Sequence, residues 1–443
     1  MSTHFPPITT ADLDWQWVDG VDIPVSKQFG DVYFSKANGL LETRHVFLNG
    51  NDLETRLAQL NPQETFIVGE TGFGTGLNFL ALWQLWQQVR PNNQSHLHFI
   101  SVEKFPLALD DLKRALSVWT ELNPMAQQLI EAYPLPFAGC HRLVFPQERI
   151  SLDLWLGDAA DCFPMMHSEQ PVNAWFLDGF APACNPELWE EQIFNHIMRL
   201  SAQGTTFASF SVAGVLKRAL KSYGVSITRP KGFGHKREML KAIWQDNAPP
   251  TLEPKTPEVL HIIGSGIAGL TCAWTAAQRG ITVHLYDQSA PLSGASGNPL
   301  AFLNPKLPPI EQAPIHLMLV CWQYAMRFYQ NFDAFKPIKI EQTHEKDLAQ
   351  IAQIAHTYPN QLVSYQELDN QKGKLCLHQG AALSPHAFAK VVLEHPLVHF
   401  HQTKIEKIEP VKDAYQLITQ HECISAKHVI CCNARELNSL LPN

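Results

Sequence analysis

Short apolar runs and longer stretches with helical spacing alternate along the first half of the chain. The apolar runs lie at 65–68, 97–102, 150–156 and 172–177, and apolar residues recur at the spacing of one helix face over 77–86. Strands that alternate with helices in this way form a doubly wound, mainly parallel sheet. The pattern therefore predicts a Rossmann-like α/β domain.

The second half begins with the same arrangement. An apolar run at 259–263 precedes a glycine-rich turn, a helical stretch follows at 270–279, and another run lies at 281–286. Farther along, the pattern predicts a helix at 315–332 and strands at 399–415 and 426–432. The expected fold class is α/β, with two Rossmann-type domains in succession.

A proline-rich segment separates the two halves. Asp246–Pro257 holds four prolines in twelve residues, which suits neither a helix nor a central strand. We interpret it as a semi-rigid linker. The predicted domains are residues 1–247 and 258–443, joined by the linker 248–257.

The composition agrees with a folded chain of two domains. Hydrophobic residues make up 45% and charged residues 17% of the 443 positions, which is enough for large cores. The formal net charge is −8. This excludes a uniformly basic nucleic-acid binder but leaves room for a local basic patch.

The sequence shows no sign of secretion or of a membrane span. No apolar run reaches the ~18 residues of a spanning helix, and the first residues lack the regions of a secretory signal. The nine cysteines include no Cys-x-x-C pair, a usage typical of reduced thiols. We therefore expect a cytoplasmic protein without a metal site.

The first glycine-rich turn, residues 69–76, has features of a cofactor loop. Gly72, Gly74 and Gly76 allow a ligand to approach the backbone closely. Glu70 would repel a pyrophosphate but could hold an ammonium group. The Gly-Lys-Ser/Thr sequence of nucleoside triphosphate loops is absent.

Three apolar runs of the first half are followed by an acid: Glu103, Asp158 and Asp178. In an open parallel sheet, ligands bind at the carboxyl ends of the strands. Glu103 is placed to accept the hydroxyls of a ribose, and Asp158 to accept from an adenine amino group. With an ammonium at Glu70, this set describes S-adenosylmethionine better than a dinucleotide. The alternative is that these are ordinary turn acids.

Asp178 opens a segment, 178–186, that is too rich in Gly and Pro for the interior of a helix or strand. A nitrogen methyltransferase needs a free lone pair on its acceptor amine. A carboxylate could orient that amine and take its proton. Asp178 is therefore the candidate catalytic residue, although it could instead cap the next helix.

Basic residues gather shortly before the linker. Between positions 217 and 241 there are eight Lys or Arg residues and one acid, Glu238. Such a run can neutralise phosphates, and a solvated surface is the alternative. The candidate nucleic-acid contacts are Lys231, Lys236 and Arg237, beside the turn at 232–235.

Five segments together resemble one family, the bacterial bifunctional proteins of tRNA 5-methylaminomethyl-2-thiouridine biosynthesis. They are Asp31–Ser35, Asn38–Phe47, Gly69–Phe79, Asp178–Ala183 and Gly232–Met239. The resemblance implies S-adenosylmethionine-dependent methylation of an aminomethyl group on the wobble uridine of tRNA. Asp178 would sit at the acceptor. The implied cofactor residues are Glu70, Gly72, Gly74, Glu103 and Asp158, to which we add Gly76.

The second half resembles the FAD-dependent oxidoreductase of that family, which is of the D-amino-acid-oxidase type. Gly264-Ser-Gly-Ile-Ala-Gly269 joins a strand to a helix, and Asp287 follows 18 residues later, where a ribose acceptor belongs. Gly294-Ala-Ser-Gly-Asn298 resembles the segment near the flavin. The resemblance implies removal of the carboxymethyl group from 5-carboxymethylaminomethyluridine. The predicted FAD residues are Gly264, Gly266, Gly269, Asp287, Gly294, Ser296 and Asn298.

The family's flavin domain continues beyond the region that matches 426–443 here. The predicted strand near Cys432 also lacks the usual glycine ending. We therefore expect an incomplete flavin site, weak FAD binding and no oxidation by this half alone. A separately encoded C-terminal segment would then be a partner.

Three hypotheses follow from these features. The leading one is a tRNA-modifying enzyme with two domains. A small-molecule amine methyltransferase fused to a flavin amine oxidase is the alternative, and the salt sensitivity of tRNA binding separates the two. A tRNA-binding scaffold without activity is disfavoured by Glu70, Glu103 and Asp178.

Overall fold

The chain divides into two units, and the first lies mainly within residues 1–254. The computed structural model describes residues 7–18, 20–35, 38–245, 257–305, 307, 317–368 and 371–440. The predicted linker 248–257 lies outside the described residues except for Pro257. The domain limits therefore remain a prediction.

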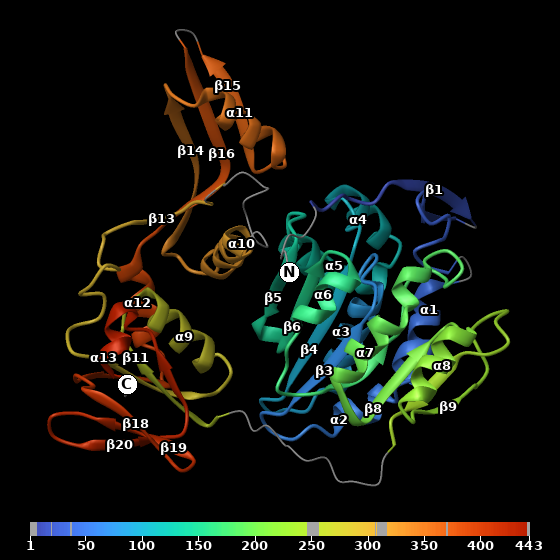
Figure 1. Cartoon of the computed structure of the whole chain (residues 1–443), viewed down its shortest axis with the longest axis horizontal. Coiled ribbons are helices and arrows are strands. Elements are labelled where there is room, and N and C mark those ends of the chain that lie inside the picture. Colours follow the sequence, from blue (N-terminus) through green and yellow to red (C-terminus); the bar gives the residue numbers. More distant parts are fainter. Residues whose placement is uncertain are drawn as a thin grey trace. The chain divides into compact units, whose positions relative to one another are not determined.

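An eight-stranded sheet forms the centre of the first unit (Figure 1). The five central strands pair in parallel, and the strands at the two ends pair antiparallel with their neighbours. In spatial order the strands are β5 (Gly139–Phe145), β6 (Ile150–Leu156), β4 (His96–Glu103), β3 (Thr65–Glu70), β7 (Val172–Phe176), β8 (Ser201–Ser209), β10 (Leu240–Ile243) and β9 (Ser226–Thr228).

Both faces of this sheet are buried. On β3, Phe66 and Val68 lie in one apolar core, whereas Ile67 lies in the other, because successive side chains of a strand point to opposite faces. The same alternation separates Trp175 from Phe176 on β7. A strand that is buried on both sides reads as a continuous apolar run, which is why the sequence revealed these strands.

Helices cover both cores (Figure 1). One face is covered by α2 (Leu53–Ala58), α3 (Leu77–Val89), α4 (Leu109–Leu116) and α5 (Asn123–Ala132), and the other by α6 (Ala159–Met165), α7 (Glu191–Arg199) and α8 (Gly214–Ser222). Before them come a hairpin, β1 (Leu13–Val18) and β2 (Val21–Ser26), and the short helix α1 (Gly39–Thr43), which continues as a π-helical stretch over Arg44–Asn49.

The strand order reverses beside β3. From β3 the chain moves outward on one side through β4 and β6, and then returns to place β7 and β8 on the other side. The connections at the carboxyl ends of β3 and β7 therefore diverge and leave a crevice, the place where open α/β sheets bind ligands. Among the predicted acids, Asp178 follows β7, whereas Glu103 ends β4 and Asp158 follows β6.

The second unit has its own parallel sheet, with the strand order β17 (Val398–Gln402), β12 (Thr282–Asp287), β11 (Val259–Ile263) and β21 (Val429–Cys431). Its apolar core lies against α9 (Ile267–Ala277), α10 (Leu317–Tyr329) and α12 (Pro385–Leu393). The helix α9 begins three residues earlier than the apolar pattern indicated, within the glycine-rich segment 264–269.

Two antiparallel sheets complete the second unit. One contains β13 (Ala301–Leu303), β14 (Phe335–His344), β15 (Val363–Leu368) and β16 (Lys372–Leu383), with α11 (Leu348–Thr357), and the other contains β18 (Lys407–Val411), β19 (Ala414–Ile418) and β20 (Cys423–Ala426). The last helix is α13 (Leu437–Leu440).

The single strand predicted at 399–415 was wrong, because this region contains most of β17, all of β18 and the start of β19. The segment 403–406 and the turn at 412–413 break it into separate strands. The strand predicted at 426–432 is likewise shorter, since Ala426 ends β20 and β21 covers only Val429–Cys431.

None of the helices in the described ranges combines the length and the apolar character that a membrane crossing requires. The nine cysteines are all free thiols.

We predict that Gly69→Ala destabilises the first unit. A Cβ at this position would lie 2.4 Å from the ring of Trp175, which is itself fully buried. Overpacking of this kind costs about 1–3 kcal/mol, measurable as a lower urea midpoint. Ser226→Ala, on the exposed edge strand β9, is the control and should change stability by less than about 0.5 kcal/mol. Equal midpoints for the two variants would contradict the packing described.

Candidate active site

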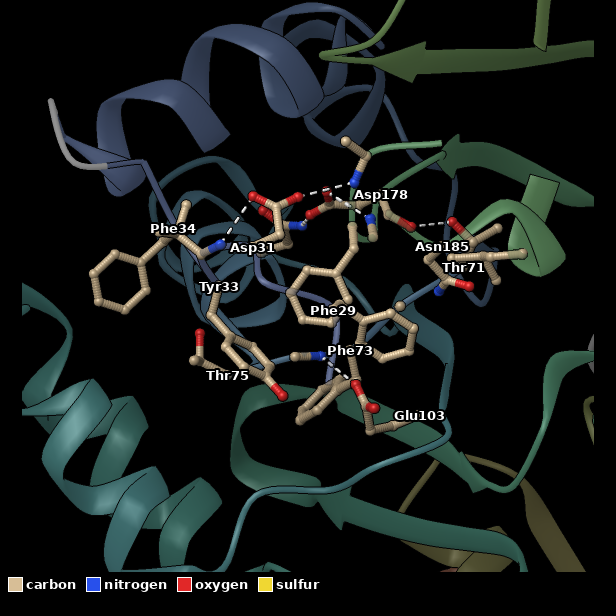
Figure 2. Close-up of a pocket in the computed structure, with 18 of the residues that line it drawn as sticks. Phe29, Asp31, Tyr33, Phe34, Thr71, Phe73, Thr75, Glu103, Asp178 and Asn185 are labelled. Atoms are coloured by element: carbon tan, nitrogen blue, oxygen red, sulfur yellow. Dashed lines mark hydrogen bonds between the residues drawn. The ribbon is translucent and has the colours of Figure 1, made fainter. Parts of the chain in front are cut away.

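A cavity of about 470 Å³ lies at the carboxyl ends of β3, β4 and β7 (Figure 2). Three of the acids that line it, Glu103, Asp158 and Asp178, are those predicted from the sequence. The acidic and lysine side chains of its lining are Asp31, Glu42, Glu103, Asp158, Asp178, Glu187, Lys104 and Lys236. The excess of acids over lysines favours cationic ligands.

The glycine loop forms one wall of this cavity. Gly74 and Gly76 have φ angles of +54° and +74°, in the left-handed region that favours glycine. A Cβ at Gly72 would lie 3.4 Å from the carbonyl oxygen of Asp178. Gly72 and Gly74 line the cavity, whereas Gly76 packs behind it against the ring of Phe73.

Glu103 ties the glycine loop to the end of β4. Its carboxylate accepts hydrogen bonds from the backbone N–H groups of Gly74 and Phe105, both at 2.8 Å. Burial raises the pKa of Glu103 to about 7 in spite of these donors. Each carboxylate oxygen keeps a second lone pair, so Glu103 can still accept from a ligand hydroxyl.

The side-chain amide of Asn78, in the first turn of α3, joins two carboxyl groups. Its Nδ2 donates to Glu70 Oε1 at 2.8 Å and to Asp178 Oδ2 at 2.6 Å. Its Oδ1 accepts from Thr43 Oγ1 at 2.7 Å. The bond from Thr43 fixes which way the amide points, so both of its hydrogens face the carboxyl groups.

The two bridged carboxyl groups have different surroundings. Glu70 is 1% exposed, and burial together with the charge of Asp178 raises the pKa of Glu70 to about 8. Asp178 lines the cavity and accepts from the N–H of Gly179 at 2.8 Å, and burial raises its pKa to about 6. At neutral pH, therefore, Glu70 holds a proton and Asp178 is ionised.

Glu70 is not part of the cavity lining among the described residues. Its second oxygen accepts from Ser101 Oγ at 2.6 Å, so the protein already bonds both oxygens. A direct contact between Glu70 and a ligand ammonium stays a prediction. In this structure Glu70 is linked to the cavity indirectly, because the Asn78 amide donates both to Glu70 and to Asp178, which lines the cavity.

Asp158 has two protein partners. Its Oδ1 accepts from the N–H of Ala160 at 2.9 Å and caps α6. Its Oδ2 lies 2.6 Å from Lys104 Nζ, which also lies 3.1 Å from Glu187. The predicted contact with adenine would therefore use the lone pairs that remain on this carboxylate.

Sequence analysis did not identify the aromatic wall of the cavity. The Phe180 ring lies 4.8 Å from the Phe29 ring and 5.1 Å from the Tyr33 ring, measured between centroids. Asp31 brings these segments together, because its Oδ2 accepts from the N–H of Ala181 at 3.0 Å. Such rings suit stacking on a planar base.

Asn78 and Glu42 were also missed as site residues. The only signal for them was that, like Asp31 and Tyr33, they fall in the segments that carry the family resemblance.

The three predicted nucleic-acid contacts differ in position. Lys231 and Arg237 are exposed. Lys236 is also exposed, but it lines the cavity as well, with its Nζ 2.7 Å from Glu42 Oε1. The basic loop is therefore continuous with the mouth of the cavity.

In the second unit, the glycine turn after β11 packs tightly. Gly264 has a φ of +102°, and a Cβ at Gly269 would lie 1.8 Å from the carbonyl oxygen of Gly264. Asp287, at the end of β12, accepts from the N–H and the Oγ of Ser265, both at 2.8 Å. The turn and the strand-end acid thus have the arrangement predicted for a dinucleotide site.

The 294–298 segment reaches this turn through Ser296. Its Oγ accepts from the N–H of Ile267 at 3.1 Å, at the start of α9. A Cβ at Gly266 would lie 3.3 Å from that oxygen. Gly294 and Asn298 are exposed, so the structure brings Ser296, but not these two, against the glycine turn.

Comparison with known proteins identifies both halves. A family model described as an S-adenosyl-L-methionine-dependent methyltransferase matches residues 120–245, and one described as an FAD dependent oxidoreductase matches residues 260–442. The tRNA 5-methylaminomethyl-2-thiouridine biosynthesis bifunctional protein MnmC of Acinetobacter baylyi is 60% identical over 98% of this chain and 71% of its own length. The chain belongs to the MnmC family.

More distant MnmC proteins match over the same extent. The MnmC of Psychrobacter cryohalolentis is 40% identical over 98% of this chain and 70% of its own. A solved structure, MNMC2 from Aquifex aeolicus, is 19% identical with a TM-score of 0.43, and the match covers 74% of this chain and 88% of that one. The chain thus carries both MnmC domains, the S-adenosylmethionine-dependent methyltransferase and the FAD-dependent oxidoreductase, which confirms the predicted fold class.

We predict that Glu70→Gln changes how stability depends on pH. The pKa of Glu70 is raised to about 8 in the folded chain from an ordinary value near ~4.3. The folded state then binds the extra proton, so the wild-type free energy of unfolding falls as pH rises between these values, by up to about 1.4 kcal/mol per pH unit. Urea titrations at pH 5, 6, 7 and 8 should show a shallower slope for Glu70→Gln. Parallel curves would contradict the buried neutral acid.

Proposed function

We propose that this chain acts in making 5-methylaminomethyl-2-thiouridine at the wobble position of tRNA. Its methyltransferase domain methylates the amine of 5-aminomethyl-(2-thio)uridine, and its oxidoreductase domain is of the kind that forms this amine from 5-carboxymethylaminomethyl-(2-thio)uridine. The names of the MnmC relatives give the product, and the two family models give the methyl donor and FAD. The small-molecule alternative is not favoured, because the relatives act on tRNA.

The observation that carries the methyl transfer is the position of Asp178, which lines the cavity and accepts hydrogen bonds from Asn78 and from the N–H of Gly179. An aminomethyl group is protonated in water and must lose a proton before its nitrogen can react. S-adenosylmethionine, when bound, supplies an electrophilic methyl group. Asp178 would take this proton first. The freed lone pair would then form the new N–C bond as the S–C bond of the donor breaks.

The bonds around Asp178 suit this role. The Asn78 amide and the N–H of Gly179 fix the two carboxylate oxygens. Glu70, bonded to the same amide, stays neutral and adds no competing negative charge. Two carboxyl groups with pKa values pushed apart are a common arrangement for acid–base work.

The remaining site residues complete the donor side of the proposal. Glu103 would accept from the ribose, Asp158 would face the adenine, and Gly72 and Gly74 would let the donor approach the loop. These residues fit a cationic donor because acids outnumber lysines around the cavity.

The exposed Lys231 and Arg237 would bind tRNA phosphates. We propose a cytoplasmic location, since the tRNA substrates of the family reside there.

FAD, when bound, supplies a two-electron oxidation. Gly264, Gly266 and Gly269 would admit the pyrophosphate to the start of α9, with Ser296 at the same helix end. Asp287 would accept from the ribose of the adenosine. Gly294 and Asn298 would lie toward the flavin ring of the bound FAD.

The direct test of this function is mass analysis of wobble nucleosides after incubation of 5-carboxymethylaminomethyl-uridine tRNA or aminomethyl-uridine tRNA with each cofactor in turn. S-adenosylmethionine should convert the aminomethyl form to the methylaminomethyl form. No methylated nucleoside from the aminomethyl form would contradict the proposal.

We predict that Asp178→Asn lowers kcat for methyl transfer by roughly 10²–10⁴-fold, the usual contribution of a positioned base. The amide keeps the shape of the side chain, so calorimetry should show unchanged affinity for S-adenosylmethionine. A kcat within a few-fold of wild type would refute the assigned role.

The pH profile gives a second check of Asp178. Only the ionised carboxylate takes a proton, and its pKa is raised to about 6, so wild-type kcat should fall as pH decreases through about 6. Asp178→Asn should lack this acidic limb. A limb that persists in the variant would belong to another group.

We predict that Asp287→Ala lowers FAD affinity at least about tenfold, because the ribose loses a charged acceptor and the N–H of Ser265 loses its partner. Flavin fluorescence during titration with FAD measures the change. Glu409→Ala, on an exposed strand of the same unit, is the control and should bind FAD like wild type. Unchanged affinity in Asp287→Ala would place the adenosine elsewhere.

A further inference from the structure

One ion pair in the cavity wall joins the proposed acceptor site to the basic loop. Lys236 Nζ lies 2.7 Å from Glu42 Oε1. The carboxylate side chain is 12% exposed and the lysine side chain 45%, so the pair runs from the cavity toward solvent. Lys236 Nζ also lies 4.4 Å from the centroid of the Phe210 ring. The lysine end of the pair is therefore the one that can leave.

Glu42 lies close enough to Asp178 for their charges to interact. The charge of Glu42 raises the pKa of Asp178, and the charge of Lys236 lowers it. Glu42 is in the first turn of α1, whose Thr43 also orients the Asn78 amide. Two carboxylates and one ammonium thus share the end of the cavity at which the methyl acceptor is proposed to lie.

The partner of Glu42 resembles the proposed substrate. A lysine side chain ends in a primary ammonium on a CH₂ group, as the 5-aminomethyl group of the uridine does. A carboxylate as buried as Glu42 is costly without a cation beside it. The lysine can therefore leave at low cost only when another ammonium replaces it.

The exposed, lysine end of the Glu42–Lys236 ion pair lies among other basic residues that attract phosphates. Lys236 is flanked in the loop between β9 and β10 by Arg237 and, a short way back, by Lys231, both exposed. Half-exposed ion pairs are weak, because solvent screens them. A tRNA phosphate at this loop would compete with Glu42 for the lysine ammonium.

We propose that Glu42 is a second carboxylate that binds the acceptor amine, and that Lys236 occupies it until tRNA arrives. On binding, Lys236 Nζ moves to a phosphate, and the substrate ammonium takes its place between Glu42 and Asp178. No covalent bond changes in this exchange. The inference rests on the proposed function, since it names how that site receives its substrate.

The exchange predicts opposite effects on two substrates. The first is tRNA that carries 5-aminomethyl-2-thiouridine, and the second is the free nucleoside 5-aminomethyluridine, which has no phosphate to draw the lysine away. Lys236→Met should lower kcat/KM for the tRNA several-fold, because a phosphate contact is lost. The same variant should raise kcat/KM for the nucleoside several-fold, because the competing ammonium is gone.

Glu42→Gln should raise KM for both substrates by about tenfold, because the amine loses one charged partner, and leave the affinity for S-adenosylmethionine unchanged. Lys113→Met removes an exposed lysine on α4 that pairs with Asp110. As the matched control, it should leave both kcat/KM values at the wild-type level.

A nucleoside kcat/KM that is unchanged or lower in Lys236→Met would overturn the proposal, provided that calorimetry shows normal binding of S-adenosylmethionine. Should Lys236→Met fail to bind it, Lys236→Gln makes the same test with a smaller change of shape. An unchanged KM in Glu42→Gln would also overturn it. Wild-type protein that methylates neither substrate would refute the proposed function itself, and this outcome is distinct from both variant results.

Discussion

The arrangement of the acids around the cavity of the first unit depends on one side-chain amide. Asn78 donates from a single nitrogen to Glu70 and Asp178, and this holds two carboxyl groups beside each other at the carboxyl ends of β3 and β7. Two buried carboxylates that share one hydrogen-bond donor would repel each other strongly, so one of the two groups keeps a proton. Because Glu70 is the more deeply buried, the proton stays there and Asp178 remains the base. The amide thereby divides the roles of two similar acids.

The same kind of hydrogen bond stabilises the glycine turn of each unit. The acid that ends one strand, β4 or β12, accepts an N–H from the turn that follows the neighbouring strand, β3 or β11. Glu103 accepts from Gly74 at 2.8 Å, and Asp287 accepts from Ser265 at 2.8 Å. The bond fixes a turn that must stay open for a ligand, and it holds the carboxylate where a ribose would meet it. A strand-end acid is thus structural before any ligand is present.

The sequence predicted the parts of this protein in which one local pattern, an apolar run followed by an acid, marks a buried strand and its end. Strands buried on both faces, such as β3 and β7, read as apolar runs, and the acids Glu103, Asp158 and Asp178 directly follow them. Residues that reach the cavity from elsewhere carried no such signal. Glu42 comes from the short helix α1, and Asn78 looks like any polar residue in a first helical turn.

Tertiary contacts also place some of the predicted site residues differently from what the sequence indicated. Lys236 belongs to a basic run, yet its half-exposed side chain places the ammonium group beside Glu42 at the cavity wall. Glu70 belongs to the glycine loop, yet Ser101 and Asn78 hold it behind the cavity wall. Partners far apart in the sequence decide such orientations, and no local pattern encodes them. The strand error at 399–415 has a local cause instead, since two short breaks, at 403–406 and 412–413, were taken as part of one strand.

The central claim is that Glu70 is protonated and Asp178 is ionised at neutral pH. Infrared difference spectroscopy tests it directly, because a protonated carboxyl group has a carbonyl band that a carboxylate lacks. At pH 7 the wild-type chain should show such a band from a buried acid. Glu103, whose pKa is raised to about 7, also contributes a carbonyl band at this pH. The component assigned to Glu70 should be lost in Glu70→Gln and persist in both Glu103→Gln and Asp178→Asn. A band that disappears only in Asp178→Asn, or no band at all in the wild type, would contradict the account.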